Sequence, residues 1–101
     1  MTGPLLLGVD SGTSWVKSVA FDRAGRELAM ARREVTIHTP LPGRSEVDMH
    51  QAWEAAAATM ADVAKAVGGE RIAAVGIAGT TCGFWPIDDA GRPVRRAILW
   101  N

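Results

Sequence analysis

The first 22 residues constrain the fold of this chain most. Residues 5–9 form an apolar run that ends in Asp10, and residues 16–21 form a second apolar run after a short turn. Two such runs joined by a tight turn are typical of a β-hairpin. Because Gly12 has no Cβ, the turn can take a positive φ and its backbone N–H groups can approach an anion closely. The segment therefore predicts an anion-binding hairpin.

The side chains around this turn suit a nucleotide phosphate. Thr13 and Ser14 add hydroxyl donors, and Lys17 adds a mobile cation. Asp10 is placed to hold Mg²⁺, which prefers a few carboxylates together with phosphate oxygens and water. The plainer alternative is a hairpin with a Gly turn, a capping Asp and a surface Lys. A Walker loop is excluded, because the pattern Gly-x-x-x-x-Gly-Lys is absent.

Composition narrows the class of protein. The chain has 101 residues, which is one domain or part of one, and its 48% apolar and 22% charged residues are ordinary for a globular protein. Eleven basic and eleven acidic residues leave no net charge, which argues against nucleic acid or an anionic membrane as the main partner. We interpret the two basic pairs, Arg32-Arg33 and Arg95-Arg96, as solvated surface.

Cysteine and histidine usage excludes some kinds of site. Cys82 is the only cysteine, so neither an internal disulfide nor a cysteine-rich metal site is available. Since no signal peptide is visible either, we expect a cytoplasmic protein. The apolar run at residues 5–9 is too short to span a membrane. His38 and His50 lack partners at metal-ligand spacing and are predicted to be surface or capping residues.

Three further segments complete the predicted first half. Residues 27–37 are predicted to be a third strand, and residues 22–26 the turn before it. The three strands then form an antiparallel meander. The Pro- and Gly-rich segment at residues 38–45 is predicted to be a surface loop.

A long helix is predicted over residues 49–67. Asp48 is expected to be its N-cap, with Gln51 in the capping-box position, and Gly68-Gly69 are expected to end it with a left-handed cap. Its bulky apolar residues recur at helical spacing: Trp53, Met60, Val63 and Val67. We interpret Trp53 as a core residue packed against a sheet.

The near-continuous apolar run at residues 72–79 predicts a strand that is buried on both faces. A helix-length crossover places it parallel to and beside the first strand. Residues 84–88 and 94–100 flank a turn and predict one more hairpin. The order β-β-β-α-β is that of an α/β, RNase H-like fold, of which this chain would hold an incomplete first domain.

Three separated blocks carry a resemblance to a known family. The segment Asp10-Ser11-Gly12-Thr13-Ser14 followed by Lys17 resembles the phosphate-1 motif of actin, Hsp70 and the sugar kinases. Together with residues 72–83 and 87–101 it is similar to the N-terminal part of the FGGY carbohydrate kinases, which include xylulokinases, glycerol kinases and ribulokinases. The resemblance covers nearly the whole chain.

The resemblance implies roles for individual residues. It implies that Asp10 holds Mg²⁺ and that Gly12, Thr13, Ser14 and Lys17 hold the phosphates of ATP. It places Thr81, Cys82 and Trp100 at the sugar. Where this chain has Thr80-Thr81-Cys82, xylulokinases commonly carry Gln-Met-His and glycerol kinases an Asn-Gln-Arg-Glu run. The resemblance therefore leaves the identity of the sugar open. For Cys82 a small buried hydrophobe is the alternative to a substrate contact.

The implied activity is transfer of the γ-phosphoryl group of ATP to a hydroxyl of a ketose or polyol. The resemblance implies that the catalytic base lies beyond residue 101, so we expect residues 1–101 to be an undivided, inactive N-terminal fragment of such a kinase. The expected partner is a small sugar or polyol, without nucleic acid or membrane, and a homo-oligomer of the full-length parent is left open. The alternative is a non-catalytic fragment or an actin-like ATP-binding module.

Overall fold

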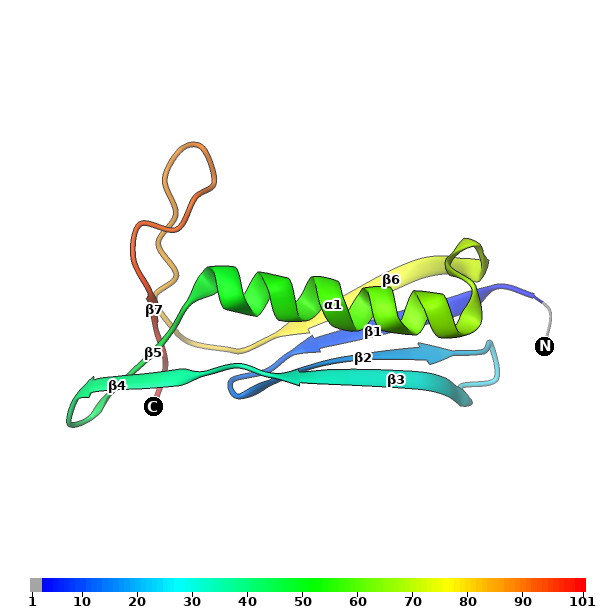
Figure 1. Ribbon diagram of the computed structural model, residues 1–101, viewed down its shortest axis with the longest axis horizontal. Coiled ribbons are helices and arrows are strands. Elements are labelled where there is room, and N and C mark those ends of the chain that lie inside the picture. The colour runs from blue at the N-terminus through cyan, green and yellow to red at the C-terminus, as the bar shows by residue number, and fades with distance from the viewer. Residues whose placement is uncertain (1–2) are drawn as a thin grey trace.

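A four-stranded sheet forms the centre of the computed structural model, which describes residues 3–101. Its strands are β1 (Leu5–Ser11), β2 (Trp15–Phe21), β3 (Glu27–Glu34) and β6 (Ile72–Gly79), in the order β3-β2-β1-β6 (Figure 1). The first three pair as an antiparallel meander, and β6 runs parallel to β1 with Val9 opposite Ile77. The predicted position of β6 is confirmed.

Helix α1 (Met49–Val67) covers β2 and β3 on one face of this sheet. Between helix and sheet lies the core, to which β1 contributes Leu7 and Val9 and β2 contributes Val16 and Ala20. The core also contains a satisfied polar pair, because the Ser18 and Thr59 hydroxyls are buried and 2.9 Å apart, within hydrogen-bond distance.

The N-terminus of α1 is capped only in part as predicted. The Asp48 carboxylate accepts a hydrogen bond from the His50 N–H at 2.9 Å, which confirms the N-cap. The predicted capping box does not form, because Gln51 Oε1 accepts from the Thr36 N–H at 2.9 Å instead of from the backbone of the helix start. Thr36 lies between β3 and β4, where its N–H has no ladder partner, so Gln51 satisfies the strand end rather than the helix end.

At the other end, α1 stops at Val67, before Gly68, as predicted. The Gly68 φ of 92° is positive, but its ψ of 104° is outside the left-handed helical region. A short 3₁₀ turn, η1 (Gly69–Arg71), then leads into β6.

The core role predicted for Trp53 is wrong. Its side chain is 65% exposed, whereas α1 buries Ala55, Thr59 and Val63, which are spaced four apart. Trp53 precedes Ala55 by two residues and so points roughly 200° away from it around the helix. Small residues on the buried face bring α1 close to the sheet, and the position of the largest apolar side chain did not reveal that face.

A second, three-stranded sheet was not predicted. It contains β4 (Ile37–Leu41), β5 (Arg44–Val47) and the short strand β7 (Ala97–Ile98), in the order β4-β5-β7. The loop expected at residues 38–45 is thus wrong: β4 and β5 form a hairpin around Gly43, whose φ is 76°. Pro40 is tolerated because β4 is an edge strand with an irregular register.

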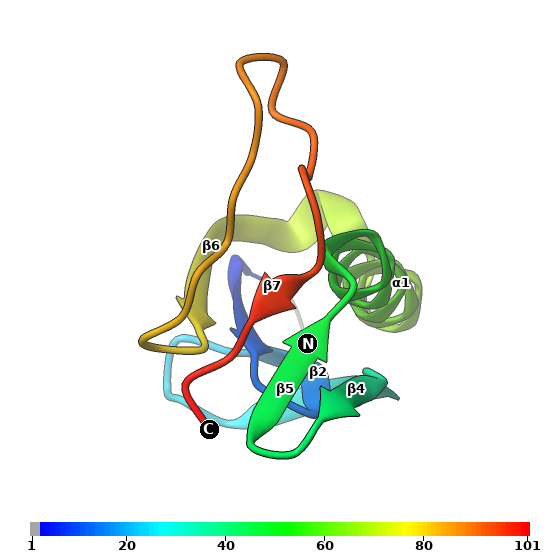
Figure 2. The same ribbon diagram turned by 90° about the vertical axis from the view of Figure 1, so that its left-hand side faces the viewer.

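The prediction that β6 is buried on both faces is also wrong. Val75 is 51% and Ile77 72% exposed. The reason is the position of α1, which covers β2 and β3, whereas β6 is an edge strand paired only with β1. In Figure 2 α1 and β6 lie on opposite sides of the view.

The segment between Phe84 and β7 forms an extended arm that projects from the two sheets (Figure 2). Bridges join Phe84 to Ile98 and Ile87 to Pro93, which confirms the predicted hairpin. Among residues 3–101, no helix combines the length and the apolarity that a membrane crossing requires.

Candidate functional site

The turn between β1 and β2 is closed by Gly12, although not in the way the sequence predicts. Gly12 does not have the positive φ that its missing Cβ would allow. It is required for another reason, since a Cβ at this position would lie 2.9 Å from the Trp15 carbonyl oxygen. The Gly12 N–H donates to the same oxygen at 2.9 Å. This N–H is therefore used within the hairpin and is not free for an anion.

The predicted phosphate residues nevertheless surround one cavity. It has a volume of about 280 Å³, and we call it the hairpin cavity. Its lining consists of the five predicted residues and two that sequence reasoning missed: Asp10, Gly12, Thr13, Ser14 and Lys17, with Trp15 and Arg32. The donors available to an anion there are hydroxyls and cations rather than the Gly12 amide.

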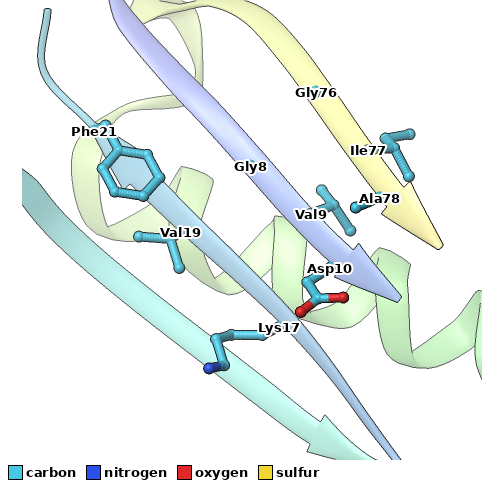
Figure 3. Close-up of a pocket in the computed structure, with 9 residues that line it drawn as sticks. All are labelled: Gly8, Val9, Asp10, Lys17, Val19, Phe21, Gly76, Ile77 and Ala78. Carbon is cyan, nitrogen blue, oxygen red and sulfur yellow. The ribbon is translucent and has the colours of Figure 1, made fainter. Parts of the chain in front are cut away.

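Asp10 and Lys17 also line a second, larger hollow of about 500 Å³ on the face of the sheet opposite α1 (Figure 3). The two residues are partners in the register of β1 and β2. In Figure 3 the Lys17 side chain extends over β3, away from the Asp10 carboxylate. Gly8 and Gly76 are register partners, and because neither has a side chain, the space above the sheet at this point stays open.

The segment after β6 contacts the β1–β2 hairpin directly. Thr13 Oγ1 and Thr80 Oγ1 are 3.1 Å apart, and Trp100 Nε1 donates to Thr13 Oγ1 at 3.4 Å. The Thr80 N–H also donates to the Ser11 carbonyl oxygen at 2.9 Å. Thr13 thus connects the predicted phosphate residues with the predicted sugar residue Trp100.

Thr81 and Cys82 follow Thr80 and are exposed. The alternative of Cys82 as a buried hydrophobe is therefore wrong. Cys82 has a φ of 51°, which is uncommon for a residue other than glycine, because the chain turns sharply there. The next residue, Gly83, packs so closely that a Cβ would lie 2.9 Å from the Ile98 carbonyl oxygen.

A third hollow of about 250 Å³, the Thr80 cavity, lies between Ser11, Gly79, Thr80 and Trp85. Sequence reasoning missed Thr80 and Trp85. The pair Thr80-Thr81 at a predicted strand end was a signal for Thr80. Only the structure shows that Thr80, and not Thr81, turns toward the β1–β2 hairpin. No signal in the sequence singled out Trp85.

Strand β7, which ends two residues before Trp100, pairs with β5, and β5 carries a buried carboxylate. Glu46 is 3% exposed and pairs with the side chains of Arg44, Arg95 and Arg96 at 2.6, 2.7 and 3.0 Å. Burial raises the pKa of Glu46, but the hydrogen bonds and charges of Arg95 and Arg44 outweigh it, so the pKa lies below its ordinary value. The interpretation of the Arg95-Arg96 pair as solvated surface is therefore wrong.

Comparison with known proteins decides the family. Residues 5–101 match the model of the FGGY family of carbohydrate kinases, N-terminal domain. The chain belongs to the FGGY family. It is 37% identical over 99 residues to a glycerol kinase of Aquifex aeolicus and 36% identical over 101 residues to a xylulose kinase of Escherichia coli. Each alignment covers 96% of this chain and 20% of the relative, so the chain spans about a fifth of the length of these kinases.

Solved structures agree with the FGGY assignment. The xylulose kinase of Rhodospirillum rubrum matches with a TM-score of 0.88 and 26% identity, over 94% of this chain and 20% of that one. The α/β, RNase H-like class predicted from the element order is confirmed, and the order β-β-β-α-β holds for the main sheet. The hairpin β4–β5 and strand β7 are additions to it.

The donor set of this FGGY domain suits Mg²⁺ bound to a nucleotide rather than a metal held by the protein alone. Within residues 3–101 no three His, Cys, Asp or Glu side chains are grouped to hold a metal ion. The hairpin cavity contains one carboxylate, that of Asp10. Mg²⁺ is commonly bound by one or two carboxylates together with phosphate oxygens and water, so a single Asp fits this use.

Proposed function

We propose that this chain forms the part of an ATP-dependent sugar or polyol kinase that holds the phosphates of ATP and one wall of the sugar site. The observation that carries the proposal is the contact of Thr13 with both Thr80 and Trp100. Through it the cavity lined by the motif residues adjoins the segment that follows β6. A donor and an acceptor of a phosphoryl group must meet in this way, because in-line transfer depends on positioning.

On the nucleotide side, Lys17 and the hydroxyls of Thr13 and Ser14 would bind phosphate oxygens from the hairpin cavity. Asp10 would hold Mg²⁺, which neutralises charge on the transferred group when bound. Lys17 is placed to add a second neutralising charge. None of these residues is suited to take a proton from the acceptor, since each has a task at the phosphates.

On the acceptor side, Trp100 would provide an apolar wall, and Thr81 and Cys82 would provide polar contacts. We assign the base that takes the proton from the acceptor hydroxyl to a segment outside residues 1–101. The Thr80 cavity supports this, because none of its lining residues carries a carboxylate or an imidazole. The named relatives act on glycerol and xylulose, so a small polyol or ketose is the proposed acceptor class.

The test is a comparison of Asp10→Ala with the unsubstituted sequence in a kinase that contains this chain as its N-terminal part. Steady-state assays use Mg·ATP with a panel of pentuloses, hexuloses and polyols. We expect kcat to fall roughly 100-fold while the affinity for the sugar changes little, because Asp10 serves the nucleotide. Equal turnover at saturating Mg·ATP would contradict the proposal.

A second assay tests where the base lies. The 101-residue chain alone should release no ADP in response to a sugar, because positioning and exclusion of water need the rest of the cleft. Sugar-dependent ADP release that disappears in Asp10→Ala would show that the chain is complete in itself and that our assignment of the base is wrong.

A further inference from the structure

Arg32 on β3 adds a second cation to the hairpin cavity. It is the register partner of Lys17 on β2, so both side chains lie on the face of the sheet opposite α1. Like charges directly opposite each other on neighbouring strands destabilise a sheet. A negative charge between or above two cations in this arrangement would therefore relieve their repulsion.

The described residues provide little of that charge. Within residues 3–101 neither Lys17 nor Arg32 forms an ion pair, although five other arginines do: Arg26, Arg33, Arg44, Arg95 and Arg96. Asp10 is the one acidic residue in the lining of the hairpin cavity. The cavity thus carries one more positive than negative charge before any ligand enters.

The neighbouring residue shows that this pattern is specific to one face. Arg33 lies on the opposite face of β3 and its guanidinium bonds the Asp62 carboxylate on α1 at 2.7 Å. Arg33 is therefore neutralised by the fold, whereas Arg32 is not. The two adjacent arginines have the same charge and differ in their surroundings.

Trp15 holds the Arg32 guanidinium in position at the cavity. The Cζ atom of Arg32 lies 4.8 Å from the centroid of the Trp15 ring, which is a cation–π contact. Such stacking restricts a long side chain before a ligand binds and so lowers the entropic cost of binding. The edge of a stacked guanidinium remains free to donate, and its planar fork matches two oxygens of a phosphate.

We propose that Arg32 is a further binding residue for the outer phosphates of Mg·ATP, acting from β3 beside Lys17. This inference rests on the proposed function of the hairpin cavity and extends it by a residue outside the β1–β2 hairpin. Trp15 acts as the positioning residue for the guanidinium.

The test is an NMR titration of the 101-residue chain with Mg·ATP and, separately, with Mg·tripolyphosphate, which has the phosphates without the nucleoside. Arg32→Ala should weaken binding of both probes roughly tenfold, since a charge-assisted bidentate contact is lost. The matched control is Arg33→Ala, which removes the same charge from the opposite face and should change both dissociation constants less than about twofold. Arg32→Lys should recover part of the loss, and Arg32→Gln should resemble Arg32→Ala.

The outcomes separate this inference from the proposed function. Equal weakening by Arg32→Ala and Arg33→Ala would overturn the inference, because only net charge would matter. Unchanged binding in Arg32→Ala together with weaker binding in Lys17→Ala would overturn it while leaving the proposed function intact. If the unsubstituted chain binds neither probe, this inference fails, whereas the proposed function is still decided by Asp10→Ala in the longer kinase.

Discussion

Two turns in this protein have nearly the same five residues, Asp-Arg-Ala-Gly-Arg at 22–26 and Asp-Asp-Ala-Gly-Arg at 88–92. Their backbones are equivalent. In each, the Asp carboxylate accepts from the N–H groups two and four residues later, all at 2.9 Å. In each, the glycine has a positive φ, 84° at Gly25 and 78° at Gly91.

The surroundings of the two turns differ. Asp22 is 5% exposed, and its second oxygen accepts from Arg26 Nε at 2.8 Å. Asp88 lies at the tip of the projecting arm and is exposed. The comparison shows that a short motif determines a turn locally, whereas the strands around it decide how much that turn contributes to stability.

The largest expected difference follows from removing the two carboxylates. Asp22→Ala should lower Tm by roughly 10 °C, because the partly buried N–H groups of Ala24 and Arg26 and the Arg26 side chain lose the buried carboxylate that accepts from them. Asp88→Ala should lower it by about 3 °C or less, because water replaces the lost acceptor there. Thermal melts followed by circular dichroism measure both, and equal losses would show that burial of the turn has no energetic weight.

The two glycines should instead respond alike. At Gly25 and Gly91 an added Cβ meets no atom within 4 Å, so the cost comes only from the positive φ. We expect Gly25→Ala and Gly91→Ala each to destabilise by about 1 kcal/mol. Chemical denaturation measures the two changes, and a much larger cost at Gly25 would reveal tertiary strain that the turn geometry does not predict.

Acid should separate the two turns again, by a smaller amount. The backbone N–H of Arg26 lowers the pKa of Asp22 below its ordinary value of 3.8 and outweighs burial, which raises it. The stabilisation that the Asp22 carboxylate provides is therefore complete above the ordinary pKa of an aspartate. It is lost as the pH falls through the lower pKa that Asp22 has in the folded protein. Asp22→Asn should flatten this part of a Tm against pH curve, whereas Asp88→Asn should retain it. Identical curves for the unsubstituted protein and both variants would contradict a stabilising role for the Asp22 carboxylate. Glu46, whose pKa is also lowered, accounts for the acid dependence that remains in each variant.

The smallest effect is expected at the last residue of each turn. The Arg26 side chain is 70% exposed while it pairs with Asp22, and surface ion pairs contribute little. Arg26→Ala should lower Tm by about 2 °C, and Arg92→Ala should leave it within about 1 °C. Addition of 1 M NaCl should reduce the first difference, and a salt-independent loss would mean that packing rather than charge is responsible.

Local patterns predicted the features that depend on neighbours along the chain. The Asp48 N-cap, the end of α1 before Gly68 and the two turns all involve atoms a few residues apart. The motif around Asp10 and Lys17 likewise predicted the residues that line the hairpin cavity, because strand alternation places both on one face. The hairpin β4–β5 did not follow from this reasoning, since its Pro-rich sequence favours a loop and pairing with β7 supports it as a strand.

The sequence by itself determined the strand order of the four-stranded sheet, the single long helix and the side chains available to an anion. Only the tertiary structure decided which face of α1 is buried, that Thr80 rather than Thr81 bonds Thr13, and that Arg32 joins Lys17 while Arg33 pairs with α1. The physical reason is that these outcomes depend on partners far apart in the chain, such as residues 13 and 80. Hydrophobic period and turn chemistry describe single segments, whereas contacts between segments follow from how closely they pack.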